Sequence, residues 1–172
     1  TTLFRSPPRA SFPDAPALAQ VHDNSSIDNM TYNAVRLLCS FGSPAQSAAI
    51  PVVAGTSVPL VRHLASASNI HGADGLGGVE GLVDRSDPQV KAKLEQALKC
   101  NAVIAIADAC RALADGETMT LVATGAFTNV ALFVSIFPEL ARQKLDSIVC
   151  MGGAEGRGNK SPVAEVRPSF IE

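Results

Sequence analysis

The segment from residue 119 to residue 151 constrains the fold more than any other part of the sequence. Residues 119–124 and 147–151 are short apolar runs typical of strands, and the apolar run 128–137 between them is predicted to be a helix ended by Pro138. A strand, a helix and a strand in this order predict a parallel unit with a right-handed crossover. The loops that follow the two strands then open at the same edge of the sheet, where open α/β sheets usually bind their ligands.

The rest of the chain adds helices and one further strand to this unit. Helical spacing of apolar residues predicts helices over residues 27–39, 89–99 and 102–114, and residues 51–54 read as a short buried strand. Residues 1–20 are rich in Pro, Ser and Arg and are expected to form an irregular leader. The predicted fold is α/β, with a mostly parallel open sheet and helices on both faces, formed by residues 21–172.

Composition and charge exclude several classes of protein. Fourteen Lys and Arg face sixteen Asp and Glu, and no basic stripe is present, so nucleic acid is not an expected partner. The apolar stretches are shorter than the roughly 20 residues needed to cross a bilayer, so no membrane association is expected. The four cysteines form no C-x-x-C pair and lie in apolar surroundings, which favours reduced thiols and a cytoplasmic location.

The short motifs associated with phosphate binding or nucleophilic catalysis are absent. The G-x-G that begins at Gly75 has Glu80 where a third glycine is needed, and no G-x-S-x-G elbow occurs. The histidines His22, His63 and His71 lack metal-ligand spacing. His71 opens a glycine-rich segment, residues 69–81, which is expected to be a mobile surface loop able to close over a ligand.

The segment after the last predicted strand carries hydrogen-bonding side chains. Two glycines at residues 152 and 153 let the backbone turn, and Asn159, Ser161 and Glu165 follow. Asn offers a donor and an acceptor and Glu offers two acceptor oxygens, which suits the neighbouring hydroxyls of a sugar. The alternative interpretation is an ordinary solvated loop in which Asn159 forms a turn.

Four ordered blocks of the sequence together resemble the inosine-uridine-preferring nucleoside hydrolases. They match that family in order and spacing and cover nearly all of residues 21–165. The blocks are V-H-D-N-S-S-I-D-N-M-T-Y-N-A-V-R-L-L (21–38), H-G-A-D-G-L-G-G (71–78), L-V-A-T-G-A-F-T-N-V-A-L (121–132) and M-G-G-A-E-G-R-G-N-K-S-P-V-A-E (151–165).

The resemblance implies an enzyme of nucleoside catabolism that hydrolyses the N-glycosidic bond of purine or pyrimidine ribonucleosides, such as inosine or uridine, to free base and ribose. By resemblance, the backbone carbonyl of Thr124 is a calcium ligand and Asn24 lies near the metal and the attacking water. Asn159 and Glu165 would bind ribose hydroxyls, and His71 would lie on the loop that closes over the nucleoside. The family also implies a homo-oligomer, either a dimer or a tetramer.

The sequence departs from the family pattern at the metal site and beyond it. The family's D-x-D-x-x-x-D-D motif does not occur, Asp23 stands where the family has Gly, and Arg167 stands where a ribose-binding Asn is expected. Calcium needs six to eight oxygen ligands. We therefore expect a truncated or divergent member with weak or no calcium binding and impaired activity. The alternatives are an inactive nucleoside- or ribose-binding module and a nonfunctional fragment.

Overall fold

A five-stranded sheet in the order β3-β2-β1-β4-β5 forms the centre of the molecule. The computed structural model describes residues 2–5, 17–22, 24–61, 63, 64 and 67–151. Its strands are β1 (Thr2–Arg5), β2 (Ala17–Ala19), β3 (Val52–Val53), β4 (Met119–Ala123) and β5 (Leu145–Cys150). The β2–β3 and β4–β5 pairs are parallel, and β1 runs antiparallel to both β2 and β4. Four of the five strands therefore share one direction, which confirms the mostly parallel sheet.

The irregular leader predicted for residues 1–20 is wrong at two places. Residues 2–5 form β1 in the middle of the sheet, and residues 17–19 form β2 beside it. Strands of three or four residues show too little alternation to be recognised from sequence. The pairing partners also lie far away, since Thr2 stands opposite both Ala19 and Ala123. Local sequence does not contain this information.

Several helices begin at residues whose side chains cap them. In α1 (Ile27–Phe41), the Ser26 hydroxyl accepts the backbone N–H of Asn29, and the N–H of Gly42 donates to the Leu38 carbonyl at the other end. The predicted helix over 27–39 is confirmed. α2 (Pro44–Ala49) was not predicted, although Ser43 and Gln46 form a capping box at its start.

The remaining helices include the one predicted between β4 and β5. They are α3 (Ser68–His71), α4 (Pro88–Ala97), α5 (Ala102–Ala112), α6 (Thr128–Ile136) and α7 (Pro138–Lys144). α4 and α5 correspond to the helices predicted over 89–99 and 102–114. The parallel unit of β4, α6 and β5 is also confirmed, with α7 inserted because Pro138 starts a new helix instead of a loop.

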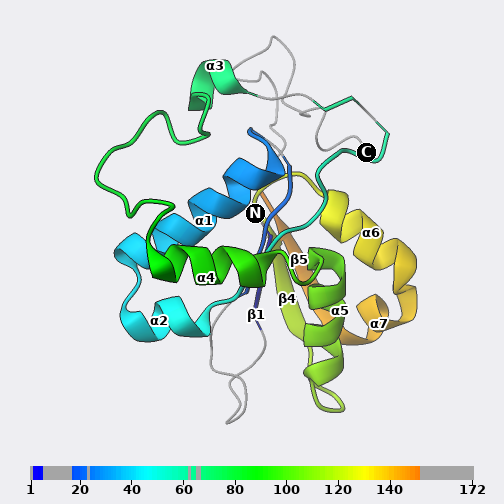
Figure 1. Ribbon diagram of the computed structural model, residues 1–172. Helices are drawn as coiled ribbons and strands as arrows, with labels where there is room; N and C mark the ends of the chain where they lie inside the picture. Colours follow the sequence, from blue (N-terminus) through cyan, green and yellow to red (C-terminus); the bar gives the residue numbers. More distant parts are fainter. Residues whose placement is uncertain (1, 6–16, 23, 62, 65–66, 152–172) are drawn as a thin grey trace.

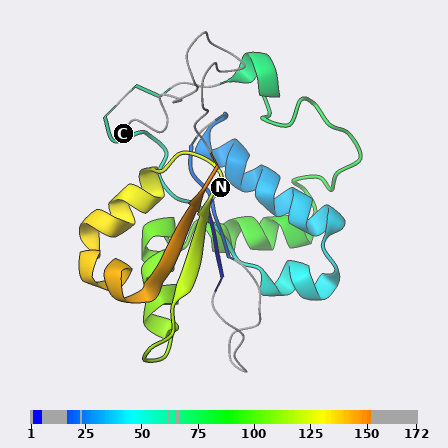
Figure 2. The ribbon, with the colours of Figure 1, turned by 180° about the vertical axis from the view of Figure 1, so that it is seen from behind.

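Helices cover both faces of the sheet, as predicted. Figures 1 and 2 show α1, α2 and α4 on one side and α5, α6 and α7 on the other. Side chains alternate between two apolar clusters: Ala17 and Ala19 of β2 face the α5–α6 cluster, whereas Leu18 packs against the α1–α4 cluster. β3 divides in the same way, with Val53 in the first cluster and Val52 in the second.

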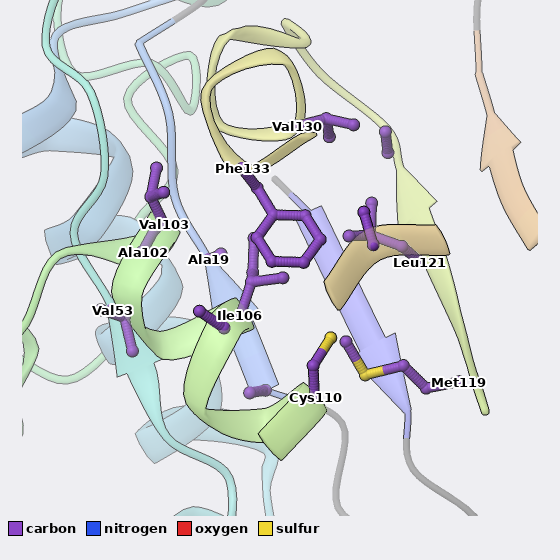
Figure 3. Packing of buried hydrophobic residues seen from close by; sticks show 14 of the residues in the cluster. Ala19, Val53, Ala102, Val103, Ile106, Cys110, Met119, Leu121, Val130 and Phe133 are labelled. Carbon is purple, nitrogen blue, oxygen red and sulfur yellow. The ribbon is translucent and has the colours of Figure 1, made fainter. Parts of the chain in front are cut away.

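The larger cluster lies between the sheet and helices α5 and α6. Phe133, Ile106 and Leu121 are fully buried there, and Figure 3 shows the Phe133 ring extending from α6 toward the other two. This cluster fixes α6 against β4 and so fixes the turn between them. None of the helices within the described residues has the length and apolar character that crossing a membrane requires.

Candidate functional site

The carboxyl ends of β2, β3 and β4 meet at one edge of the sheet. The backbone N–H of Gln20 donates to the Val53 carbonyl (2.8 Å) and that of His22 to the Thr56 carbonyl (3.0 Å), so the segments after β2 and β3 stay side by side. Figure 1 shows α3 beyond this same end of the sheet, where α6 also begins. The expected binding edge of an open α/β sheet is therefore present.

Asn129, in the first turn of α6, bonds to the segments that follow two other strands. Its Nδ2 group donates to the Gln20 carbonyl (2.7 Å), and its Oδ1 atom accepts both the backbone N–H (3.0 Å) and the hydroxyl (3.1 Å) of Thr56. Asn129 is fully buried. A Cβ atom on Gly55 would lie 2.4 Å from the Asn129 Oδ1 atom and 2.4 Å from the Gln20 carbonyl oxygen, so this packing requires glycine at residue 55.

A second buried polar pair lies beside Asn129. The Nε2 atom of His22 and the hydroxyl of Thr128 are hydrogen bonded at 3.1 Å, and both residues are buried. We call the set Gln20, His22, Thr56, Thr128 and Asn129 the strand-end junction. Sequence analysis gave none of these residues a role, although three of them lie within the blocks that carry the family resemblance. Their partners are more than 70 positions apart, which is why local patterns do not reveal the pairing.

Asn24 and His71, two of the predicted site residues, are connected through the backbone. The Asn24 carbonyl accepts the N–H of Ala67 (3.0 Å), and the Ala67 carbonyl accepts the N–H of His71 (2.9 Å). His71 is the last residue of α3, and both Asn24 and His71 are partly exposed. The structure therefore brings these two residues to the same end of the sheet. Asp23 lies outside the described residues.

The glycine-rich segment after His71 is anchored to α1. The Asn29 amide donates to the Ala73 carbonyl (3.0 Å), and the Asn33 amide donates to the Asp74 carbonyl (2.7 Å). Gly75 has a φ of +79°, and a Cβ atom there would lie 2.9 Å from the Ser25 Cβ atom. The expected irregular, mobile loop is thus wrong in its first residues, which form α3, and the loop that follows is held against α1.

Asp74 closes the turn inside this segment. Its carboxylate accepts the backbone N–H groups of Leu76 (3.0 Å) and Gly78 (3.2 Å). These bonds favour the ionised form and lower the pKa of Asp74. The Asp74 carboxylate therefore stabilises the turn within this loop.

Thr124 immediately follows β4 and is partly exposed at the same edge. The N–H of Met151 donates to the Ala123 carbonyl (2.9 Å), which places the end of β5 beside Thr124. Three of the five predicted site residues, Asn24, His71 and Thr124, therefore lie at this same end of the sheet. The other two, Asn159 and Glu165, lie outside the described residues.

The described residues do not by themselves offer a calcium site. Within the part of the chain that the structure describes, no three His, Cys, Asp or Glu side chains lie together. The Thr124 carbonyl is a single oxygen, and calcium takes six to eight.

Comparison with known proteins identifies the family. Residues 12–166 match the profile described as inosine-uridine preferring nucleoside hydrolase. The solved structures that share this fold are nucleoside hydrolases. This chain belongs to the inosine-uridine preferring nucleoside hydrolase family, which confirms the resemblance seen in the sequence.

Individual relatives agree with this assignment. The chain is 36% identical over 152 residues to the non-specific ribonucleoside hydrolase RihC of Escherichia coli (strain SMS-3-5 / SECEC), covering 88% of this chain and 44% of the relative. It is 38% identical over 149 residues to the inosine-uridine preferring nucleoside hydrolase of Leishmania major, covering 87% and 43%. The chain spans less than half the length of these curated relatives.

Solved structures match the same fold. The purine-preferring ribonucleoside hydrolase from Gardnerella vaginalis aligns with a TM-score of 0.67 at 24% identity, covering 85% of this chain and 43% of the other. An inosine-guanosine nucleoside hydrolase aligns with a TM-score of 0.65 at 25% identity, covering 83% and 42%. The arrangement of the helices around the sheet is therefore that of nucleoside hydrolases.

Proposed function

We propose that this chain carries the nucleoside-binding edge of an enzyme that hydrolyses the N-glycosidic bond of purine or pyrimidine ribonucleosides, releasing free base and ribose. The observation that carries the proposal is the convergence of Asn24, His71 and Thr124 at the carboxyl ends of the strands. All three residues lie within the blocks that resemble the family, and the relatives are named as ribonucleoside or inosine-uridine hydrolases.

The proposed roles follow the resemblance, residue by residue. Asn24 would lie near the attacking water, His71 would lie on the loop that closes over the nucleoside, and Asn159 and Glu165 would bind the ribose hydroxyls. Thr124 would offer its carbonyl to calcium, which in this family supplies a more acidic bound water. The link from Asn24 through Ala67 to His71 supports a shared pocket, because two backbone hydrogen bonds hold these residues at the same end of the sheet.

The reaction exchanges one bond for another at the anomeric carbon. The water oxygen bonds to that carbon, the bond from carbon to the base nitrogen breaks, and the base leaves with the bonding electrons and takes up a proton.

We propose that the chain alone turns over slowly, since removing a general acid or base typically costs on the order of 10²- to 10⁴-fold. An inactive nucleoside- or ribose-binding module is the second candidate, favoured by the lack of clustered metal-binding side chains among the described residues.

Calorimetry and a ribose-release assay, each with inosine and uridine and with and without calcium, test this proposal. We expect measurable nucleoside binding and little release of ribose. The variant Asn24→Ala should weaken binding by about tenfold through loss of the side-chain contact, while its carbonyl still accepts Ala67. Asn101→Ala, at the start of α5, serves as the control. Failure to bind either nucleoside contradicts the proposal, and calcium-independent binding without turnover favours the module.

We propose further that the protein works in the cytoplasm as a homodimer or homotetramer. The apolar surroundings of the four cysteines in the sequence and the family resemblance support this proposal. Light scattering after size-exclusion chromatography tests the assembly, and a single species with the mass of one chain would contradict it.

A further inference from the structure

Asn129 is a fully buried polar residue that has no role in the proposed chemistry. Its amide bonds to two segments that are distant in the sequence, at Gln20 after β2 and at Thr56 after β3. Asn129 itself belongs to the helix that follows β4. One side chain therefore connects the segments that follow β2, β3 and β4.

The chemistry of this position requires an amide of this length. The Gln20 carbonyl needs a donor, while the N–H and hydroxyl of Thr56 need an acceptor. Aspartate would bring a carboxylate against the Gln20 carbonyl, and an apolar residue would leave buried groups unpaired, which costs more than the bond itself contributes. The close approach of Gly55 leaves no room for a longer side chain.

The neighbouring turn is anchored at both of its ends. At its start, the Ala123 carbonyl accepts the N–H of Met151, and at its end Thr128 bonds to His22 while Asn129 makes its own bonds. The turn between them carries Thr124. The His22 and Gln20 contacts lie on the segment that leads directly to Asn24.

We propose that Asn129 is a positioning residue: it holds the Thr124 turn in register with the segment that carries Asn24, so that the nucleoside-binding groups are in place before the ligand arrives. The inference rests on the proposed function. Groups held in place before binding lose less entropy when the ligand binds, and affinity depends strongly on such preorganisation.

The test compares Asn129→Ala with Asn101→Ala in the full chain. Asn101 also bonds to the backbone through its side chain, accepting the N–H of Val103 (2.9 Å) at the start of α5. Both variants are expected to be less stable, because each loses a backbone hydrogen bond. Hydrogen exchange followed by mass spectrometry and calorimetry with inosine are measured for both.

We expect Asn129→Ala to speed exchange in residues 54–58 and 124–128 by about tenfold or more and to weaken inosine binding by about tenfold. Asn101→Ala should change inosine affinity by less than about twofold and speed exchange only near the start of α5. Equal losses of affinity in the two variants, or unchanged exchange in the Thr124 turn of Asn129→Ala, would overturn the inference.

Two further outcomes remain decisive. If the unmodified chain binds no inosine, the proposed function fails, while the exchange data still decide whether Asn129 holds the turn. If Asn129→Ala does not fold, Thr56→Val replaces it, because this milder change removes only the hydroxyl bond to Asn129. Faster exchange confined to the same two segments then supports the inference, and exchange unchanged in both segments overturns it.

Discussion

The strand-end junction and the strand β5 differ in which side chains they bury: the junction buries polar residues, whereas β5 exposes apolar ones. In the junction, the polar residues His22, Thr128 and Asn129 are at most 3% exposed and hydrogen bonded. On β5 and just beyond it, the apolar residues Val149 and Met151 are 52% and 61% exposed. The chain therefore completes the junction from its own residues, whereas β5 has the apolar run typical of a strand covered on both faces. The relatives, of which this chain spans less than half, have further residues available for that covering.

The largest difference between the two regions should appear when a core side chain is truncated. Phe133 lies one turn after Asn129 and is fully buried. Phe133→Ala should lower the free energy of unfolding by about 3–5 kcal/mol, because it leaves a cavity. Val149→Ala on β5 should cost less than about 1 kcal/mol. Urea unfolding measures both, and similar losses would show that β5 is as well packed as the core.

Glycine substitutions test how closely the junction is packed. Gly55→Ala should cost about 3 kcal/mol or more, since the new Cβ atom meets Asn129 and the Gln20 carbonyl and displaces their hydrogen bond. Gly77 has a φ of +70° and open space around it, so Gly77→Ala should cost only the backbone strain of about 1 kcal/mol. Thermal unfolding of the two variants distinguishes them, and equal shifts in Tm would contradict the close packing.

The reactivity of two cysteines tests the same difference in burial without a mutation. Burial raises the pKa of the Cys110 thiol to about 11, so on the order of one thiol in 10⁴ is ionised at pH 7. Cys150, at the end of β5, is exposed. Because the thiolate is the reacting form, iodoacetamide should label Cys150 on the order of 100-fold faster than Cys110. Peptide mapping after timed quenching measures the ratio, and equal rates would show that the core opens readily.

The smallest expected effect concerns pH and the loop anchored to α1. Backbone N–H groups of Leu76 and Gly78 lower the pKa of Asp74 below 3.8. A depressed pKa in the folded protein means that the carboxylate supports the turn at higher pH and loses this contribution as the pH falls through its folded pKa. The protection of the Gly78 amide against exchange, relative to an unstructured peptide at the same pH, should therefore fall below about pH 3.8. In Asp74→Asn this loss of protection should be absent, and a loss of equal size in the variant would exclude Asp74 as its source.

Sequence reasoning identified the elements whose signals are local. The helices at 27–41, 88–97 and 102–112 have caps and apolar spacing that can be read directly, the helix at 128–136 is an apolar run, and the β4–β5 unit follows from the order of its elements. β1 and β2 were missed because their pairing depends on distant partners.

The candidate site likewise contains residues that the sequence predicted and residues that it did not. Asn24, His71 and Thr124 were predicted through the family resemblance; the structure places them at the same end of the sheet, and their roles stay predictions. Asn129 was not found, because a buried asparagine early in an apolar helix resembles any other polar residue until its partners at Gln20 and Thr56 are known. The roles of Asn159 and Glu165 stay predictions.

The central position of β1 has a consequence for how the chain folds. β1 is the strand that joins the pair β3–β2 to the pair β4–β5, and its Thr2 stands opposite Ala123. β1 must therefore pair with a strand more than a hundred residues further along the chain before the two halves can be joined. Contacts of such long sequence separation slow folding. Closure of the sheet through β1 is thus expected to be a late kinetic step, during which the edges of β2 and β4 stay open to other chains.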